Sequence, residues 1–480
     1  MSELPKGWVI AKLGSYIHLK NGFAFKSKDY SEPSNMTVPV IRISDINGTV
    51  ASDEKANHVP TELAVSEFEI AKGDLLVAMS GATTGKIGVY GGRTPAYQNQ
   101  RVGNLKLNAP ELSDLGFRNH LIKYLSPTIL EIAYGGAQPN ISASGIENIE
   151  VCFPPLAEQK RIVEKLDEVL AQVDTIKSRL DGIPALLKRF RQSVLASAVS
   201  GKLTEEWRGE SGYVFHEEIQ AEVPSSWKIE TIDDIGSVKG GKRLPKGEEL
   251  VSTDTGFPYI RAGQLKKGTV IQGTDARNAQ MYLEPHVQSQ ISRYVVSEGD
   301  AYITIVGASI GDAGIIPASH SGANLTENAA KICDFQDDVL GQFLGLWLRS
   351  QLIQRLIKLE IKSGAQGKLA LMRIKTLPFP RAAFEEQKEI VRLVDQYFAF
   401  ADTIEAQVKK AQARVNNLTQ SILAKAFRGE LVAQDPNDEP ADKLLERIAQ
   451  ARKEAEALAK AAKKAQSTKS TAKKKVAKSA

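Results

Sequence analysis

The stretch that decides the fold begins at Gly136 and reads GAQPNISASGIENIEVCFPPLAEQKRIVEKLDEVLAQVDTI. A second version, GAQGKLALMRIKTLPFPRAAFEEQKEIVRLVDQYFAFADTI, begins at Gly364, and the offset of 228 residues holds without a gap for almost seventy residues. A period this long corresponds to one domain plus one connector, not to a solenoid unit of 20–50 residues. Such a duplication predicts an internal pseudo-two-fold relation, which suits a two-fold ligand or two copies of one partner.

The preceding domains are repeated more weakly. Pro5 and Trp8 recur as Pro224 and Trp227 at an offset of 219, and residues 72–88 match 298–314. The drift from 219 to 228 indicates insertions in loops, and the loop tips themselves differ in sequence. Two domains that share a fold but bind different ligands would differ at their loop tips in this way. Neutral drift in surface loops explains it equally well.

The repeated connectors have the pattern of amphipathic helices. Apolar residues recur at steps of three and four, which places them on one face of a helix; they are Ile162, Leu166, Leu170, Val173, Ile176 and Leu180 in the first copy and Ile390, Val394, Phe398, Ala401, Ile404 and Val408 in the second. Prolines precede both helices, and Gly201 and Gly429 stand where helix C-caps are expected. We expect Gly182-Ile183-Pro184 to break or restart the first helix, and the second to run unbroken from about 384 to 428.

Matching apolar stripes favour an antiparallel coiled coil of the two connectors over separate docking of each helix on its own domain. A helix over residues 156–181 would be roughly 39 Å long at 1.5 Å per residue. This length is close to one turn of B-DNA, about 34–36 Å. The repeated domains mix short β-type runs, glycine-rich turns and a helical segment. The fold class is therefore α+β, with two tandem pseudo-two-fold-related α/β domains separated by long helices.

Composition limits the classes of function. No run of eighteen apolar residues occurs, and the first residues lack the apolar core of a signal peptide. Two cysteines in unrelated contexts fit a reducing, cytoplasmic setting. Residues 441–480 have twelve Lys and Arg against four Asp and Glu, a balance of +8 in a chain of net charge +5, so everything before them is at −3. Nucleic-acid binding by the body of the protein would therefore depend on local patches.

Motifs for catalysis fail on inspection. The segment GATTGK at residues 81–86 is one residue short of a phosphate-binding loop, Ile87 replaces the Ser or Thr that would hold magnesium, and a β-turn explains it better. The six histidines show no zinc spacing. No glycine motif for S-adenosylmethionine and no nucleophile–base pair is evident, which favours a binding protein without catalytic activity.

The two connectors, PPLAEQKRIVEKLDEVLAQVDTIKSRLDGIPALLKRFRQSVLASAVSGKLTEEWR and EEQKEIVRLVDQYFAFADTIEAQVKKAQARVNNLTQSILAKAFRGEL, resemble the conserved regions of type I restriction–modification specificity subunits, most closely the enteric K-type (IA) family. The resemblance implies a DNA-binding subunit that recognises a bipartite asymmetric target, one half-site per target-recognition domain. It also implies two modification (methyltransferase) subunits, which methylate adenine, and two restriction (ATP-dependent translocase and nuclease) subunits as partners. S-adenosylmethionine, ATP and Mg2+ would belong to those partners, and the specificity subunit would have no cofactor of its own.

With this resemblance the chain divides into five segments. They are target-recognition domain 1 (1–152), helical spacer 1 (153–204), target-recognition domain 2 (205–380), helical spacer 2 (381–432) and a helical, then lysine-rich disordered tail (433–480). Two alternatives stay open: a self-contained DNA methyltransferase or nuclease, and a coiled-coil scaffold that does not bind DNA. The tail could attract DNA without sequence preference or serve only for solubility.

Base recognition requires hydrogen-bonding side chains, and phosphates require Lys and Arg. In the first domain the candidates are Arg42, Thr83, Thr84, Lys86, Gln98, Asn99, Gln100, Arg101, Gln138 and Asn140. In the second domain they are Lys242, Arg243, Lys246, Arg261, Ser309, Asn324, Lys331, Gln366 and Lys368. Arg42 and Arg261 are equivalent in both copies, which favours a phosphate contact or a structural role over base recognition.

Partner docking is expected on a further set of apolar residues in the connectors, which includes Phe398 of the second stripe. The candidates are Phe190, Val194, Leu195, Phe398, Leu423 and Phe427. Burial within the chain itself is an equally good explanation for them.

Overall fold

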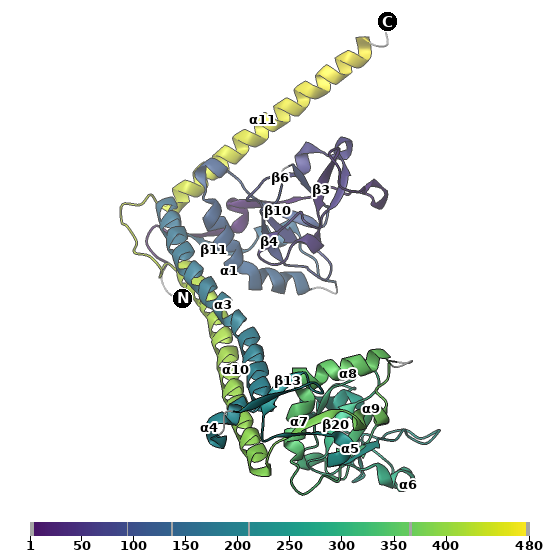
Figure 1. Ribbon diagram of the computed structural model, residues 1–480. Helices are drawn as coiled ribbons and strands as arrows, with labels where there is room; N and C mark the ends of the chain where they lie inside the picture. The colour runs from purple at the N-terminus through teal and green to yellow at the C-terminus, as the bar shows by residue number, and fades with distance from the viewer. Residues whose placement is uncertain (1–3, 94, 136–137, 210–211, 364–366, 477–480) are drawn as a thin grey trace. The chain divides into compact units, whose positions relative to one another are not determined.

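The computed structural model describes residues 4–93, 95–135, 138–209, 212–363 and 367–476. The chain forms two compact units (Figure 1). Unit 1 comprises Met1–Arg179 and Ala411–Ala480, and unit 2 comprises Leu180–Lys410. Each unit therefore combines one repeated domain with parts of both long helices. Among the described residues, no helix is apolar over a length that would cross a membrane.

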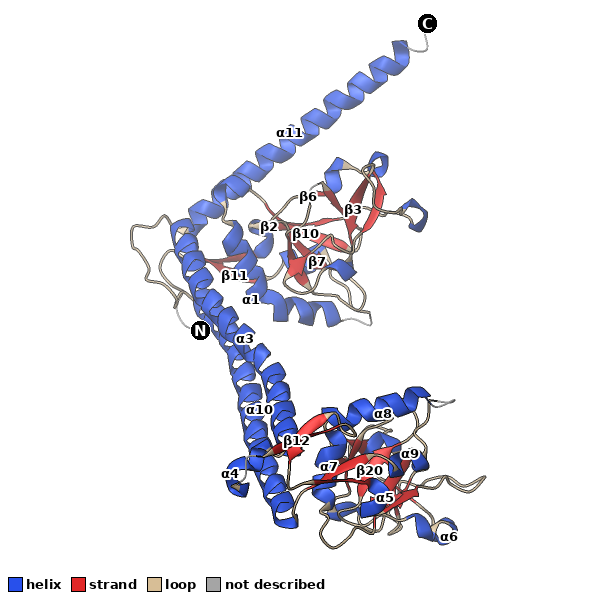
Figure 2. Cartoon of the chain, in the orientation of Figure 1, coloured by secondary structure: helices blue, strands red, loops and turns tan. Residues whose placement is uncertain are grey.

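Unit 1 is built from short strands and helices (Figure 2). Its strands are β1 (Val9–Lys12), β2 (Ile17–Asn21), β3 (Thr37–Ile41), β4 (Val50–Ala51), β5 (Asn57–Pro60), β6 (Glu69–Ile70), β7 (Leu75–Ala78), β8 (Ile87–Tyr90), β9 (Ala96–Gln98), β10 (Val102–Leu107) and β11 (Glu150–Phe153). Its helices are α1 (Leu115–Tyr134), α2 (Ala143–Glu147), α11 (Ala441–Val476), the first part of α3 (Leu156–Val199) and the last part of α10 (Phe384–Ala426). The strands form sheets in the orders β2-β10-β7-β8-β4, β5-β3-β9-β6 and β1-β11.

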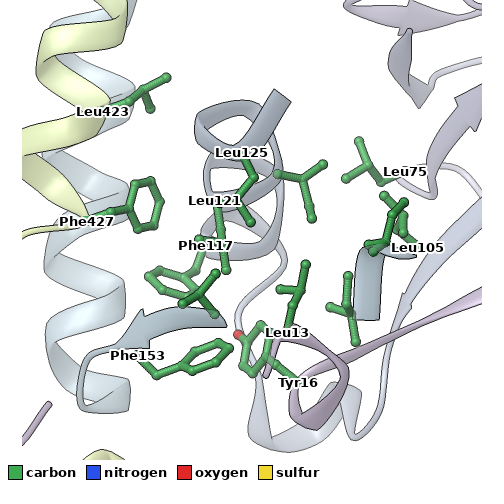
Figure 3. Close-up of a cluster of buried hydrophobic side chains, with 14 of the residues drawn as sticks. Leu13, Tyr16, Leu75, Leu105, Phe117, Leu121, Leu125, Phe153, Leu423 and Phe427 are labelled. Atoms are coloured by element: carbon green, nitrogen blue, oxygen red, sulfur yellow. The ribbon is translucent and has the colours of Figure 1, made fainter. Parts of the chain in front are cut away.

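The main core of unit 1 lies between its five-stranded sheet, α1 and the long helices. Tyr16, Phe117 and Phe153 are fully buried there, with Tyr16 in edge contact with Phe117 at a centroid distance of 5.8 Å. Phe427, just beyond the end of α10 (Phe384–Ala426), points at α1 in Figure 3 and stacks on Tyr124 at 5.0 Å. This packing fixes the start of α3 and the end of α10 to the first domain.

Unit 2 has the same plan. Its strands are β12 (Tyr213–His216), β13 (Ala221–Pro224), β14 (Lys228–Thr231), β15 (Ser237–Gly240), β16 (Pro258–Ile260), β17 (Leu265–Lys266), β18 (Thr269–Val270), β19 (Met281–Tyr282), β20 (Ala301–Thr304), β21 (Ala313–Ile315), β22 (Asn324–Leu325), β23 (Ala329–Cys333) and β24 (Pro378–Arg381). Its helices are α4 (Glu205–Arg208), α5 (Ile232–Ile235), α6 (Pro285–Gln290), α7 (Gly341–Arg349), α8 (Gln351–Ser363), α9 (Leu371–Lys375) and parts of α3 and α10. The strands form sheets in the orders β15-β23-β20-β21, β19-β16-β22, β14-β24, β12-β13 and β17-β18.

The duplication inferred from the sequence is confirmed in the strand order of the two units. The run β2-β10-β7-β8 in unit 1 corresponds to β15-β23-β20-β21 in unit 2. In each unit a parallel strand pair adjoins this sheet, β3 with β9 and β16 with β22. In each unit the strand before a long helix also pairs antiparallel with a strand near the start of the domain, β11 with β1 and β24 with β14. These pairs hold the start of each long helix against its own domain.

The two long helices pack on each other inside each unit. In unit 2, Arg191 on α3 forms ion pairs with Asp402 (2.5 Å) and Glu405 (3.2 Å) on α10. Further along α3, Val199 lies in the same core cluster as Ile390, near the start of α10, so the two segments run antiparallel. Gly201 and Gly429, which follow the two helices, have the positive φ values (73° and 76°) expected of C-caps.

The expected break at Gly182-Ile183-Pro184 is wrong, because α3 continues from Leu156 to Val199 with Pro184 inside it. A proline in a helix interior removes one backbone hydrogen bond and costs about 3 kcal/mol. Leu187 is buried, and the Phe190 ring contacts the Tyr397 ring at 6.1 Å, so packing directly after the proline offsets this cost. The expected stripe is confirmed only in part, because Ile176 is 47% exposed whereas the four stripe residues before it are buried.

Candidate nucleic-acid interface

Five loops of unit 1 meet beyond the carboxyl ends of β2, β3, β7 and β9, and we call them loop cluster 1: residues 22–25, 42–46, 79–86, 98–101 and 138–141. Hydrogen bonds that join them are Gln100 N to Phe23 O (2.8 Å), Asn99 N to Ile41 O (3.0 Å), Met79 N to Arg101 O (2.9 Å), Ile141 N to Met79 O (2.8 Å) and Thr83 Oγ1 to Ile43 O (3.1 Å). Loops that follow different strands thus form one surface with a fixed backbone.

Unit 2 repeats this arrangement beyond β15, β16, β20 and β22. Loop cluster 2 comprises residues 241–247, 261–264, 305–312, 326–328 and 367–370. Its hydrogen bonds include Lys242 N to Leu325 O (2.9 Å), Thr326 N to Ile260 O (3.1 Å), Ile305 N to Asn328 O (2.8 Å) and Leu369 N to Ile305 O (3.0 Å). The two clusters therefore share a frame, although the side chains on them differ.

One glycine in each cluster allows the loops to approach this closely. A Cβ atom on Gly22 would lie 2.2 Å from the carbonyl oxygen of Asn99, and one on Gly241 would lie 2.0 Å from that of Thr326. The obstacle is backbone in both cases, so no side chain can be accommodated without moving a loop. The glycine is required because a second loop crosses it at van der Waals distance.

The structure places every candidate of the first domain in loop cluster 1, in two groups. Thr84 and Gln98 are buried and donate hydrogen bonds to Gly81 O (2.6 Å) and Lys20 O (2.8 Å), so these two side chains hold the loops instead of facing a ligand. Asn99 donates to the hydroxyl of Tyr30 (3.1 Å), and Thr83 to Ile43 O. The exposed candidates are Lys86, Gln100, Arg101, Gln138 and Asn140.

The candidates of the second domain divide in the same way. Lys242, Arg243, Lys246 and Lys368 are exposed on loop cluster 2, and Ser309 is partly exposed there. Asn324 is buried and donates to Ile291 O (2.8 Å), which makes it structural. Lys331 lies within β23 and pairs with Asp300 at 2.9 Å, at the other end of β20 from the cluster. Gln366 lies outside the described residues.

Arg42 and Arg261 have matching structural contacts. The guanidinium of Arg42 donates to Lys55 O (3.3 Å) and lies 3.4 Å from Asp45. That of Arg261 donates to Ala276 O (3.0 Å) and Ala279 O (2.5 Å). Both side chains therefore hold the loop that follows their strand, which agrees with the structural role considered for this equivalent pair.

Loop cluster 2 borders a cleft of about 910 Å³. Four cationic residues line it, against two carboxylates: Arg243, Lys246, Arg261 and Arg277, with Glu248 and Glu327. Arg277 and Asn328 also line the cleft and were missed by sequence analysis. The place of Asn328 becomes apparent only in the strand register, where it follows β22 as Arg101 follows β9. Arg277 lies in a segment for which the repeat gives no counterpart.

The apolar residues expected to bind partners lie mainly inside their own unit. Val194, Leu423 and Phe427 are buried, at 8%, 0% and 4% exposure, in the core clusters of units 2 and 1. Phe190, Leu195 and Phe398 are partly buried against the core of unit 2. For the three buried side chains, burial within the chain itself is the arrangement that the structure shows.

Two loop clusters with a common backbone and different exposed polar side chains define a duplicated recognition protein. The described residues contain no group of three His, Cys, Asp or Glu side chains that could hold a metal ion. The family model for the type I restriction modification DNA specificity domain matches twice, at residues 5–185 and 224–412. The chain therefore belongs to the type I restriction–modification DNA specificity family.

Individual relatives agree with this assignment. The EcoBI specificity subunit of a type I restriction enzyme from Escherichia coli is 35% identical over 469 residues, which cover 94% of this chain and 93% of the relative. The EcoKI specificity subunit from Escherichia coli strain K12 is 33% identical, with 94% and 96% covered. Both relatives are named as specificity subunits of type I restriction enzymes.

Solved structures support the fold. A chain from a type I restriction–modification system superposes with a TM-score of 0.63 at 17% identity, covering 90% of this chain and all of that one. The HsdS subunit from Thermoanaerobacter tengcongensis superposes with a TM-score of 0.53 at 19% identity, covering 89% and 98%.

Proposed function

We propose that this chain binds a bipartite, asymmetric double-stranded DNA target, one half-site per repeated domain, and directs adenine methylation and restriction by partner subunits. The observation that carries this proposal is the pair of loop clusters. The shared backbone arrangement would give each domain an equivalent surface for one half-site. The different side chains on the two surfaces would then select different base sequences. Cations at the cleft of unit 2 suit the phosphate backbone of DNA.

The partners in this proposal are two modification subunits and two restriction subunits. S-adenosylmethionine, ATP and Mg2+ would be bound by those subunits, and this chain would supply sequence recognition alone. The paired segments of α3 and α10 would set the length of the unrecognised spacer between the half-sites. The complex would act in the cytoplasm, where its DNA lies.

Methylome sequencing tests the proposal directly. The chain is expressed with a cognate modification subunit in a host without modification systems of its own. We expect one split motif, methylated on adenine in both halves, which disappears when the gene for this chain is omitted. A stable complex that gives no new methylation would overturn the proposal.

Two measurements on the purified chain separate the alternatives. Methylation or cleavage of DNA by the chain alone would indicate a self-contained enzyme instead of a recognition subunit. Absence of any salt-dependent gel shift with DNA, for the chain and for its complex, would indicate a scaffold that does not bind DNA.

A further inference from the structure

Arg101 and Asn328 occupy equivalent positions in the two loop clusters. In the parallel ladders, Ile41 pairs with Gln98 and Ile260 pairs with Leu325, and each of the two loop residues comes three positions after the second strand. The carbonyl of Arg101 accepts a hydrogen bond from Met79 N (2.9 Å), and that of Asn328 accepts one from Ile305 N (2.8 Å).

The backbone at both positions is also fixed from the amino side. Arg101 N donates to the side chain of Asn99 (3.2 Å), and Asn328 N donates to the hydroxyl of Thr326 (3.5 Å). In each residue, hydrogen bonds to both the backbone N–H and the backbone carbonyl fix the position of the Cα atom that bears the side chain. Such fixed attachment is what a base-recognising side chain needs, because hydrogen-bonding geometry must be set before DNA binds.

The ends of these two side chains are free. Several polar side chains near Arg101 are used within the protein, as the contacts of Thr83, Thr84, Gln98 and Asn99 show. Within the part of the chain that the structure describes, neither the guanidinium of Arg101 nor the amide of Asn328 has a hydrogen-bond partner. Arg101 is exposed, and Asn328 is partly exposed and lines the cleft of unit 2.

The two side-chain types differ in the base that they recognise. Arginine donates two hydrogen bonds to O6 and N7 of guanine, whereas asparagine pairs with N6 and N7 of adenine in the major groove. We propose that Arg101 contacts a guanine in the first half-site and that Asn328 contacts an adenine at the corresponding place in the second. This inference rests on the proposed function and adds to it a specificity-determining position that is shared by both domains.

The equivalent position predicts a reciprocal exchange of specificity. Arg101→Asn is expected to change one base pair of the first half-site from G·C towards A·T and to leave the second half-site unchanged. Asn328→Arg is expected to change one base pair of the second half-site from A·T towards G·C. A correct bidentate pair is worth roughly tenfold or more in discrimination against the wrong base, so the change should appear in the methylated motif.

The experiment is methylome sequencing of each variant chain with the modification subunit, next to the unsubstituted chain. Lys72→Asn is the matched control, because Lys72 is an exposed cation before the amino end of β7, whereas loop cluster 1 lies beyond its carboxyl end. We expect Lys72→Asn to leave the motif unchanged. Arg101→Ala, which removes the side chain without adding a new donor, should relax the motif at one position only.

The outcomes distinguish this inference from the proposed function. Full methylation of an unchanged motif by both Arg101→Asn and Arg101→Ala overturns the assignment of Arg101 and leaves the proposed function intact. If Arg101→Asn gives no complex, Arg101→Ala decides between a relaxed and an unchanged position. Methylation that is absent with the unsubstituted chain overturns the proposed function itself.

Discussion

Trp8 and Glu158 are 150 residues apart in sequence, and the indole Nε1 of Trp8 donates a hydrogen bond of 2.9 Å to Glu158 Oε2 in the interior of unit 1. Unit 2 repeats the contact, with Trp227 donating to Glu386 at 3.0 Å. The tryptophan near the start of each domain and the Glu-Gln pair at the start of each long helix therefore meet. This contact explains why both elements are kept in a duplication whose loops have diverged.

The two carboxylates differ in the hydrogen bonds that their Oε1 atoms accept. Glu386 Oε1 also accepts from Thr204 (2.8 Å) and Arg208 (2.5 Å), whereas Glu158 Oε1 is buried without a partner among the described residues. Trp8→Phe would leave Glu158 with neither oxygen satisfied, and we expect unit 1 to lose about 1–3 kcal/mol of stability. Trp227→Phe, the matched control, should cost unit 2 less.

Hydrogen exchange measured peptide by peptide in the full chain is the suitable readout, because a protein of two units need not unfold in one step. Equal loss of protection in the two variants would contradict the role assigned to Arg208 and Thr204.

A pH dependence follows from the same site. Burial raises the pKa of the Glu158 carboxyl above its ordinary value, with the Trp8 hydrogen bond opposing this shift. A raised pKa means that the folded state binds the proton more tightly than the unfolded state, so stability falls as pH rises from about 4.3 through the raised value. Glu158→Gln removes this dependence. We expect the stability of the variant, relative to the unsubstituted chain, to improve from pH 4 towards pH 7 in thermal unfolding, and a constant difference would contradict the argument.

Sequence periodicity was sufficient to predict the long helices and the duplication, because a repeated apolar stripe is a local signal. The continuity of α3 through Pro184 was not predictable in this way, since it depends on packing by Leu187 and Phe190 that only the tertiary structure provides. Exposure of Ile176 escaped prediction for the same reason.

The sequence was sufficient to predict which loops contain the candidate recognition residues, but not which of the individual side chains are exposed. Sequence analysis named Thr84, Gln98 and Arg101 together as candidates for DNA recognition. The structure separates them, because Thr84 and Gln98 are buried and donate hydrogen bonds to backbone carbonyls, whereas Arg101 is exposed. A polar side chain that holds a loop and one that faces a ligand look alike in a sequence. Asn328 was missed because its equivalence to Arg101 appears only in the strand register.

Gly22→Ala is expected to disturb loop cluster 1 without unfolding the rest of the chain. Its Cβ would lie 2.2 Å from Asn99 O, and overpacking of this kind costs about 1–3 kcal/mol. Methylation of the split motif should weaken, and hydrogen exchange should rise around residues 98–101. Gly182→Ala is the control, because nothing beyond the neighbouring residues and the backbone of its own helix lies within 4 Å of its Cβ and the helix should gain about 0.5–1 kcal/mol. Normal protection of residues 98–101 in Gly22→Ala would show that the loops can move apart at little cost.

Phe427→Asp is expected to lower the stability of unit 1, and any loss of partner binding should be a consequence of that lower stability. Phe427 is 4% exposed and contacts the rings of Phe117 (5.6 Å) and Tyr124 (5.0 Å), so a charge there costs at least the 3–5 kcal/mol typical of Phe→Ala in a core. Phe400→Asp is the matched control, because Phe400 is 58% exposed on α10 and its change should alter stability by about 0.5 kcal/mol or less. Co-purification with the modification subunit, measured together with hydrogen exchange, separates the two effects. With Phe427→Asp, we expect the recovery of the modification subunit to fall in proportion to the loss of hydrogen-exchange protection in unit 1. A variant at Phe427 that keeps full protection and still loses the partner would show that this side chain leaves the core to bind it.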